Sequence, residues 1–287
     1  MDITYKPFAW HGINLRIPED WDMSALSGDY KEGYFRLDNP EDVCIEVKWR
    51  REKKKVDLDG IVKKYMTTLQ KPAKKEKTSF SDIGPREELN KVFLKDKEIR
   101  RFAWKSGNSE FFNLVSQCNY CHTIMMVQVP VTPGRLDVVS KVLRSLEDHY
   151  TSDFTHWAVY DFKFSMPSDF NLEKSSLKSG YLEFNFYHSN TEMKLRRWGL
   201  ADIILRDIDL QDWSRTSAPK LLRSVLTRAE KTEEPPHENL RVSTRRLSWY
   251  AFYVYHCRKA NKLYALDYKG KKDEALLNRV ISSIQCH

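Results

Sequence analysis

Apolar and polar residues alternate near the start of each half of the chain. Residues 13–17 alternate in this way, and Pro18 and Trp21 follow them. Residues 162–166 repeat the pattern, again with a proline and then an aromatic residue at the same distance. Alternation is typical of a half-buried β-strand, because successive side chains of a strand point to opposite faces. We therefore predict that each half opens with a strand that ends at a proline.

Each half also closes with the same unit, which is a strand, a glycine turn and a helix. After Gly134 and Gly270, apolar residues recur at the spacing i, i+3, i+4 and i+7, which places them on one face of a helix. These residues are Val139, Val142, Leu143 and Leu146 in the first half and Leu277, Val280, Ile281 and Ile284 in the second. We expect Leu143 and Ile281 to occupy equivalent buried positions.

Further strands and one more helix are predicted between these ends. The helices are expected over residues 58–69 and 217–230, where apolar residues again recur at helical spacing. The strands are expected near residues 33–37, 44–49, 86–94, 98–104, 111–117 and 123–129, and near 180–184, 193–198, 239–243, 248–256 and 263–268. Short turns join most of these strands, so the sheets should be antiparallel.

The shared order of elements predicts an internal duplication. A chain of 287 residues is long enough for two domains. Residues 151–156 follow no clear pattern, so we place the first domain at residues 1–150 and the second at 151–287. The predicted fold class is α+β, with two similar tandem domains that each contain an antiparallel sheet flanked by helices.

The order of elements resembles the α/β/α sandwich shared by the photosystem subunit PsbP and the Ran-binding Mog proteins. The resemblance is carried by residues 13–21, by the strand at residues 45–49, and by the closing strand, glycine turn and helix. It implies two tandem copies of that sandwich. Members of this family mostly bind other proteins, so the resemblance also implies a binding module and not an enzyme. The usual family member has a single domain, so no specific partner carries over.

The composition of the chain excludes several classes of protein. Apolar residues make up 41% of the chain and aromatic residues 13%, which is ample for packed cores. No apolar run is long enough to span a membrane, and the first residues lack the pattern of a signal peptide, so we expect a cytoplasmic protein. Five scattered cysteines are too few for a secreted disulfide framework, so we expect reduced thiols.

Positive charge is concentrated in one stretch. Residues 48–77 contain twelve basic and four acidic residues, an excess that equals the formal net charge of +8 for the whole chain. Such a stretch could bind nucleic-acid phosphates. The candidate residues are Arg50, Arg51, Lys53, Lys54, Lys55, Lys63 and Lys64. Bases could stack on Trp49 and Tyr65, although Tyr65 belongs to the apolar stripe of its helix. The alternative is an ordinary solvated lysine surface.

Cys118, Cys121 and His122 form a C-x-x-C-H motif. Two thiolates and an imidazole nitrogen are zinc ligands, but a closed tetrahedral site needs two ligands beyond the thiolates. His256-Cys257 and Cys286-His287 are further candidates. The alternative is a pair of reduced cysteines at a strand end, or a disulfide. We favour that alternative and predict no metal and no cofactor.

Catalytic motifs are missing from the sequence. It contains no G-x-S-x-G, G-x-x-x-x-G-K, H-E-x-x-H or G-x-G-x-x-G, so we assign no catalytic residue. The sequence favours a non-enzymatic binding or adaptor protein that uses a sheet face or the groove between its domains. Its expected partner is another protein. The alternatives are a nucleic-acid-binding protein that acts through residues 48–77, and an enzyme with a cleft between the domains.

Overall fold

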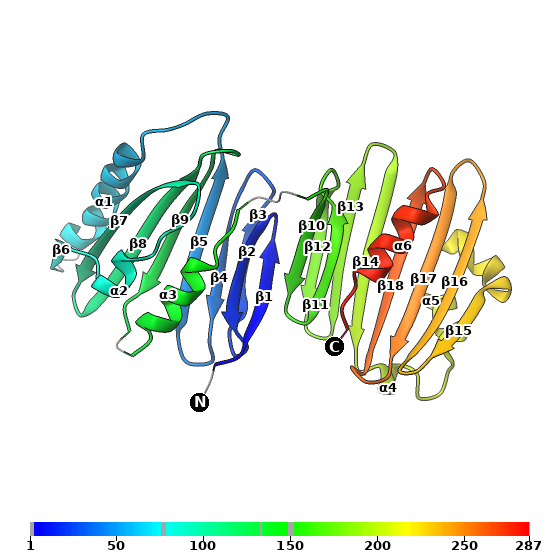
Figure 1. The fold of residues 1–287 in the computed structure, drawn as a ribbon. Coiled ribbons are helices and arrows are strands. Elements are labelled where there is room, and N and C mark those ends of the chain that lie inside the picture. The colour runs from blue at the N-terminus through cyan, green and yellow to red at the C-terminus, as the bar shows by residue number, and fades with distance from the viewer. Residues whose placement is uncertain (1–2, 76–78, 133, 149–151, 287) are drawn as a thin grey trace. The chain divides into compact units, whose positions relative to one another are not determined.

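The computed structural model describes residues 3–75, 79–132, 134–148 and 152–286 (Figure 1). The chain divides into two compact units, which are unit 1 at residues 1–151 and unit 2 at residues 152–287. The predicted domain boundary between residues 150 and 151 lies outside the described residues.

Unit 1 combines a β-hairpin, a seven-stranded antiparallel sheet and helices. The hairpin pairs β1 (Tyr5–Trp10) with β2 (Ile13–Pro18). In spatial order the sheet contains β3 (Asp22–Gly28), β4 (Glu32–Asp38), β5 (Val43–Arg51), β9 (Thr123–Pro130), β8 (Ser109–Cys118), β7 (Lys97–Ser106) and β6 (Phe80–Ile83). The helices are α1 (Leu58–Lys75), α2 (Glu87–Asn90) and α3 (Leu136–Arg144).

Unit 2 has the same order of strands. Its hairpin pairs β10 (Phe154–Val159) with β11 (Phe162–Pro167). In spatial order its sheet contains β12 (Asn171–Lys178), β13 (Tyr181–His188), β14 (Thr191–Gly199), β18 (Lys262–Gly270), β17 (Trp249–Cys257), β16 (His237–Arg245) and β15 (Glu230–Glu234). The helices are α4 (Ala201–Ile204), α5 (Leu210–Ser217), the 3₁₀ helix η1 (Lys220–Arg228) and α6 (Glu274–Ser282). Common ancestry of the two units stays a prediction.

The predicted fold class is wrong, because the protein is rich in β-structure and is not an α/β/α sandwich. Its sheets are antiparallel, as predicted. Each sheet is extended by edge strands that the sequence analysis did not identify, β3 and β6 in unit 1 and β12 and β15 in unit 2. Most of the helices are short, and α2 and α4 are single turns.

Two individual elements also differ from the prediction. The strand expected near residues 86–94 is wrong, since these residues contain the single turn α2. The helix expected at residues 217–230 is divided. Asp209 caps α5 by accepting a hydrogen bond from the backbone N–H of Asp212 at 2.7 Å. The backbone becomes extended at Ala218, the residue before a proline, and a 3₁₀ helix follows.

The two faces of each sheet pack against different elements. In unit 1 the hairpin covers one face, where the rings of Phe8 and Phe35 lie 4.8 Å apart, and α3 contacts β2. On the other face α1 contacts β6, β7 and β8 (Figure 1). In unit 2 the hairpin packs in the same way through Phe162 and Phe184, at 5.7 Å, and α6 contacts β11. On the other face of the unit 2 sheet, η1 contacts β16 and β17.

The closing helices are buried to different extents. Leu143 of α3 is only 1% exposed, as predicted, but Ile281 of α6 is half-buried, so that prediction is wrong. Leu277 and Val280 are the buried residues of α6. After each helix the chain bridges to the second strand of the hairpin. These bridges pair Asn14 with Glu147 and Lys163 with Gln285.

Candidate functional site

A cluster of polar side chains lies at the same location in each unit. In unit 1, Lys97 of β7 pairs with Cys118 of β8, and Asp148 directly follows the bridge to the hairpin. In unit 2, His237 of β16 pairs with Cys257 of β17, and Cys286 directly follows the equivalent bridge. The fold therefore brings together three segments that are far apart in the sequence, twice.

The unit 1 cluster contains an ion pair. The ammonium of Lys97 donates a hydrogen bond to the Asp148 carboxylate, and the two side chains are 4% and 0% exposed. The ligand atoms of Cys118, Cys121 and Asp148 lie within 4.8 Å of one another. Burial raises the pKa of the Cys118 thiol, which favours its protonated form. The lysine already supplies the positive charge that a metal ion would bring.

The C-x-x-C-H motif is only partly brought together. Cys118 and Cys121 are neighbours, but their third partner in the cluster is Asp148 and not the predicted ligand His122. The backbone carbonyl of His122 instead accepts a hydrogen bond from the side-chain amide of Gln117 at 3.2 Å. No disulfide joins any of the five cysteines, all of which lie in the described part of the chain.

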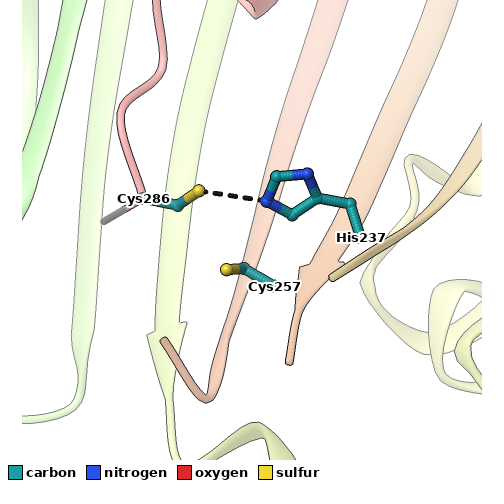
Figure 2. Close-up of side chains that lie close together, drawn as sticks. All are labelled: His237, Cys257 and Cys286. Carbon is teal, nitrogen blue, oxygen red and sulfur yellow. Dashed lines mark hydrogen bonds between the residues drawn. The ribbon is translucent and has the colours of Figure 1, made fainter. Parts of the chain in front are cut away.

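The unit 2 cluster has a different chemical character (Figure 2). The ligand atoms of His237, Cys257 and Cys286 lie within 4.8 Å of one another. His237 Nε2 and Cys286 Sγ form a hydrogen bond at 3.2 Å (Figure 2). Cys257 is buried, whereas the other two residues are half-buried. Burial, together with the neighbouring Cys257, raises the pKa of Cys286 to about 11.

The sequence contained only part of the signal for this cluster. Cys257 and Cys286 each stand beside a histidine in the sequence. His256 precedes Cys257 on the same strand, so alternation points it to the opposite face of the sheet. His287 lies outside the described residues. The histidine that joins the cluster is His237, and only the register of β16 against β17 identifies it.

The predicted nucleic-acid residues do not form one continuous surface of available cations. Arg51 is held inside unit 1, where its guanidinium donates to the backbone oxygens of His11 at 2.8 Å and Tyr30 at 2.9 Å. Arg50 is exposed and pairs with Glu52 at 2.6 Å. The exposed lysines are Lys53, Lys54 and Lys55 before α1 and Lys63 and Lys64 on α1. Lys77 lies outside the described residues.

Neither aromatic residue of this stretch is placed for stacking on a base. Trp49 is 3% exposed, and its ring packs 6.0 Å from that of Phe35. Tyr65 is half-buried and donates a hydrogen bond to Gln128 at 2.7 Å. The basic stretch therefore offers charge without the stacking surfaces that single-strand binders use.

Part of the unit 1 sheet is not covered by α1, which lies over β6, β7 and β8 on the same face. The side chains that residues 32–38 and 46–50 direct to this side are exposed or half-exposed. We call this set the uncovered face: Glu32, Tyr34, Arg36, Asp38, Glu46, Lys48 and Arg50.

Charges of both signs are arranged on the uncovered face. Arg36 pairs with Asp38 at 2.9 Å and donates to Ser24 at 2.9 Å. The Lys48 ammonium lies 5.9 Å from the centre of the Tyr34 ring. Burial and the neighbouring Glu46 carboxylate raise the pKa of Tyr34, so its hydroxyl stays protonated. Several of these side chains are thus positioned by their neighbours.

The proline and aromatic turns line a pocket in each unit. The unit 1 pocket, of about 580 Å³, is lined by Pro18, Trp21 and Arg135 among others. The unit 2 pocket, of about 750 Å³, is lined by Pro167, Phe170 and Asp273 among others. Each lies beside the start of the closing helix. In unit 1, Arg135 forms ion pairs with Glu41 and Asp42 at the pocket, so we assign it no ligand.

Unit 1 should lose stability on mild acidification because of His11. This residue is 5% exposed, and burial followed by the charge of Arg51 lowers its pKa from 6.5 to about 4. Between these values the unfolded chain takes up a proton that the folded chain does not. The stabilisation is complete above pH 6.5 and is lost as the pH falls to about 4. It amounts to about 3 kcal/mol.

Chemical denaturation at a series of pH values tests this expectation. His11→Gln should flatten the pH dependence between about 6.5 and 4, since glutamine does not titrate there. His156→Gln makes the same substitution at an exposed position of unit 2 and is the matched control. Equal pH profiles for wild type and His11→Gln would contradict the assignment.

Comparisons with known proteins leave the chain without an assigned family. No family model matches it, and no curated protein matches it. Among solved structures, the chain is similar to the apo structure of the immunity protein TplEi of T6SS from Pseudomonas aeruginosa, with 9% identity and a TM-score of 0.33. That alignment covers 98% of this chain and 97% of the other. The same protein complexed with "L" peptide aligns over 99% of both chains, with 10% identity and a TM-score of 0.29.

These TM-scores are too low to carry an argument about fold or function. Neither structure is a PsbP or a Mog protein. Within the described residues, the structure has no helix that is both long enough and apolar enough to cross a membrane.

Proposed function

We propose that the chain is a protein-binding module and that the uncovered face of unit 1 binds an acidic surface of another protein. The observation that carries the proposal is the combination of exposed Lys48 and Arg50 with half-exposed Tyr34 and Arg36 on adjacent strands. Tyrosine and arginine are enriched among the residues that dominate protein interfaces, and complementary charge steers association.

The side chains of the uncovered face are already ordered by their neighbours, which supports binding to a protein surface. Arg36 is held by Asp38 and Ser24, and the ring of Tyr34 lies beside Lys48. Side chains that are already ordered lose less conformational entropy when a partner binds, so more of the contact energy appears as affinity.

The chemistry of the same residues favours a protein over a nucleic acid. Asp38 and Glu46 place carboxylates among the cations, and these would repel a phosphate backbone, which carries only negative charge. An acidic protein surface can also carry cations, and these can pair with the two carboxylates. Trp49 and Tyr65, the aromatic residues of the basic stretch, are turned inward. Nucleic-acid binding through residues 48–77 is the competing function.

The test begins with capture of proteins from nuclease-treated extract of the source cells. Each captured protein is then purified and titrated against the full chain. Lys48→Glu/Arg50→Glu should weaken binding of an acidic partner by about 10- to 100-fold, because like charges then meet at the interface. The matched control is Lys220→Glu/Arg228→Glu, which makes the same charge change at exposed positions of unit 2. It should leave the affinity unchanged.

A single-stranded oligo(dT) probe distinguishes the competing function. We expect weak binding at low salt that disappears near physiological salt, since charge alone supplies the attraction. Tight binding at physiological salt that is lost in Lys53→Gln/Lys54→Gln/Lys55→Gln would support nucleic-acid binding and contradict the proposal. A captured protein that binds both charge-reversal variants equally would also contradict it.

A further inference from the structure

We propose that His237, Cys257 and Cys286 form a zinc-binding site in unit 2. The proposal does not depend on the uncovered face of unit 1. An imidazole nitrogen and two sulfurs are the ligand types that zinc prefers in proteins, and Cys₂His sets with one open position are known among zinc sites. Figure 2 shows the two sulfurs and the imidazole converging from three separate segments.

The distances fit a tetrahedral ion after small side-chain shifts. Zn–S and Zn–N bonds of about 2.3 and 2.0 Å imply separations of roughly 3.3–3.8 Å between ligand atoms. The three ligand atoms already lie within 4.8 Å of one another, and His237 Nε2 is 3.2 Å from Cys286 Sγ. Side-chain adjustments of about 1 Å would therefore complete the geometry.

Two of the ligands stand on a rigid framework, and the third is held close to it. His237 and Cys257 are direct partners in the pairing of β16 with β17. Cys286 follows Gln285, whose backbone N–H donates to the carbonyl of Lys163 at 3.0 Å. The ring of His237 also packs edge-on against Tyr255 at 5.6 Å, which limits its rotation. Ligands fixed in this way lose little freedom when a metal binds.

In unit 1 a lysine and an aspartate occupy the positions that correspond to His237 and Cys286. Lys97 takes the place of His237 in the strand pairing, and Asp148 takes the place of Cys286 after the bridge. The lysine ammonium supplies a built-in positive charge there. Unit 2 has neither the lysine nor the carboxylate at these positions.

The site would keep one coordination position for water. It provides three protein ligands, whereas zinc takes four. His237 and Cys286 are half-buried, so solvent can reach the cluster from their side, while Cys257 closes the buried side. A fourth ligand from solvent would therefore complete the tetrahedron.

The experiment uses the full chain without an affinity tag, treated with a chelator and kept reduced by a phosphine. Addition of Zn²⁺ and removal of excess should leave one ion per chain by elemental analysis. Co²⁺, as a spectroscopic replacement, should produce thiolate-to-metal charge-transfer absorption and the intense d–d bands of tetrahedral coordination. Cys286→Ser should weaken Zn²⁺ binding by more than about 100-fold, beyond the effect of losing an outer-shell partner.

Two further variants keep the test decisive. His237→Lys/Cys286→Asp recreates the residues of unit 1 and should abolish binding while circular dichroism stays that of the folded chain. Cys121→Ser removes a thiol from the unit 1 cluster and should leave binding unchanged. Absence of stoichiometric Zn²⁺ in the reduced wild type, its retention in His237→Lys/Cys286→Asp, or its loss in Cys121→Ser would each overturn the proposal.

Discussion

Asp148→Ala should lower the free energy of unfolding of unit 1 by about 3–5 kcal/mol. The carboxylate is fully buried and is the partner of Lys97, whose side chain is also buried. Removing it leaves an ammonium in a medium that solvates charge poorly, and that uncompensated charge accounts for most of the loss. Hydrogen exchange of the β8 amides in the full chain measures the effect within unit 1.

The double variant Lys97→Met/Asp148→Leu is the control for this interpretation. It replaces both charges by apolar groups, so no charge remains buried, and stability should return to within about 1 kcal/mol of wild type or exceed it. A loss below about 1 kcal/mol for Asp148→Ala would contradict this interpretation, because it would mean that the Lys97 ammonium becomes solvated when its partner is removed.

Leu143→Ala should destabilise unit 1 by about 2–5 kcal/mol, because it leaves a cavity as well as losing apolar burial. Ile281→Ala, at the corresponding position of unit 2, should cost less than half as much. The physical reason is that Leu143 is almost fully buried whereas Ile281 is partly in contact with solvent.

Denaturant unfolding and hydrogen exchange of α3 and α6 give these two values separately. Leu277→Ala is the matched control in α6, because Leu277 is fully buried, and it should show the larger loss. Equal losses at Leu143 and Ile281 would contradict the difference in packing between the two closing helices.

Much of each sheet was predictable because apolar and polar residues alternate along its strands. Strands such as β2 and β11 carry a clear apolar and polar pattern, and the short turns between later strands fixed their antiparallel pairing. The edge strands gave no such signal. All five residues of β15 are exposed, so no apolar periodicity exists to identify it. Without the edge strands, the sheets looked smaller and the helices more important than they are.

The divided helix of unit 2 shows a second limit of periodicity. Ala218 and Leu222 are buried, as the apolar stripe predicted, but Ala218 is extended and precedes the 3₁₀ helix. Burial at helical spacing therefore did not require one continuous helix. The residue that caps the start of α5 is also visible in the sequence, since Asp209 lies three residues before Asp212, the spacing of an N-cap hydrogen bond. The apolar stripe instead predicts a helix start at Ser217, which is where α5 ends.

The candidate site was hidden for a different reason. The C-x-x-C-H motif is contiguous in sequence, but the cluster of unit 2 joins residues 237, 257 and 286. Their proximity depends on the register of two strands and on where the chain returns after α6. Register follows from the whole pattern of packing and turns, so a local motif search does not find such a cluster.

Strand β15 also bears on how the protein behaves in concentrated solution. Its outer side has backbone groups to which a strand from a second molecule could add, as happens at the start of fibril growth. Its sequence, Glu-Lys-Thr-Glu-Glu, would stack three carboxylates against those of an identical strand about 4.8 Å away. That repulsion discourages edge-to-edge growth of the sheet, and neutralising these glutamates should make unit 2 prone to aggregation at high concentration.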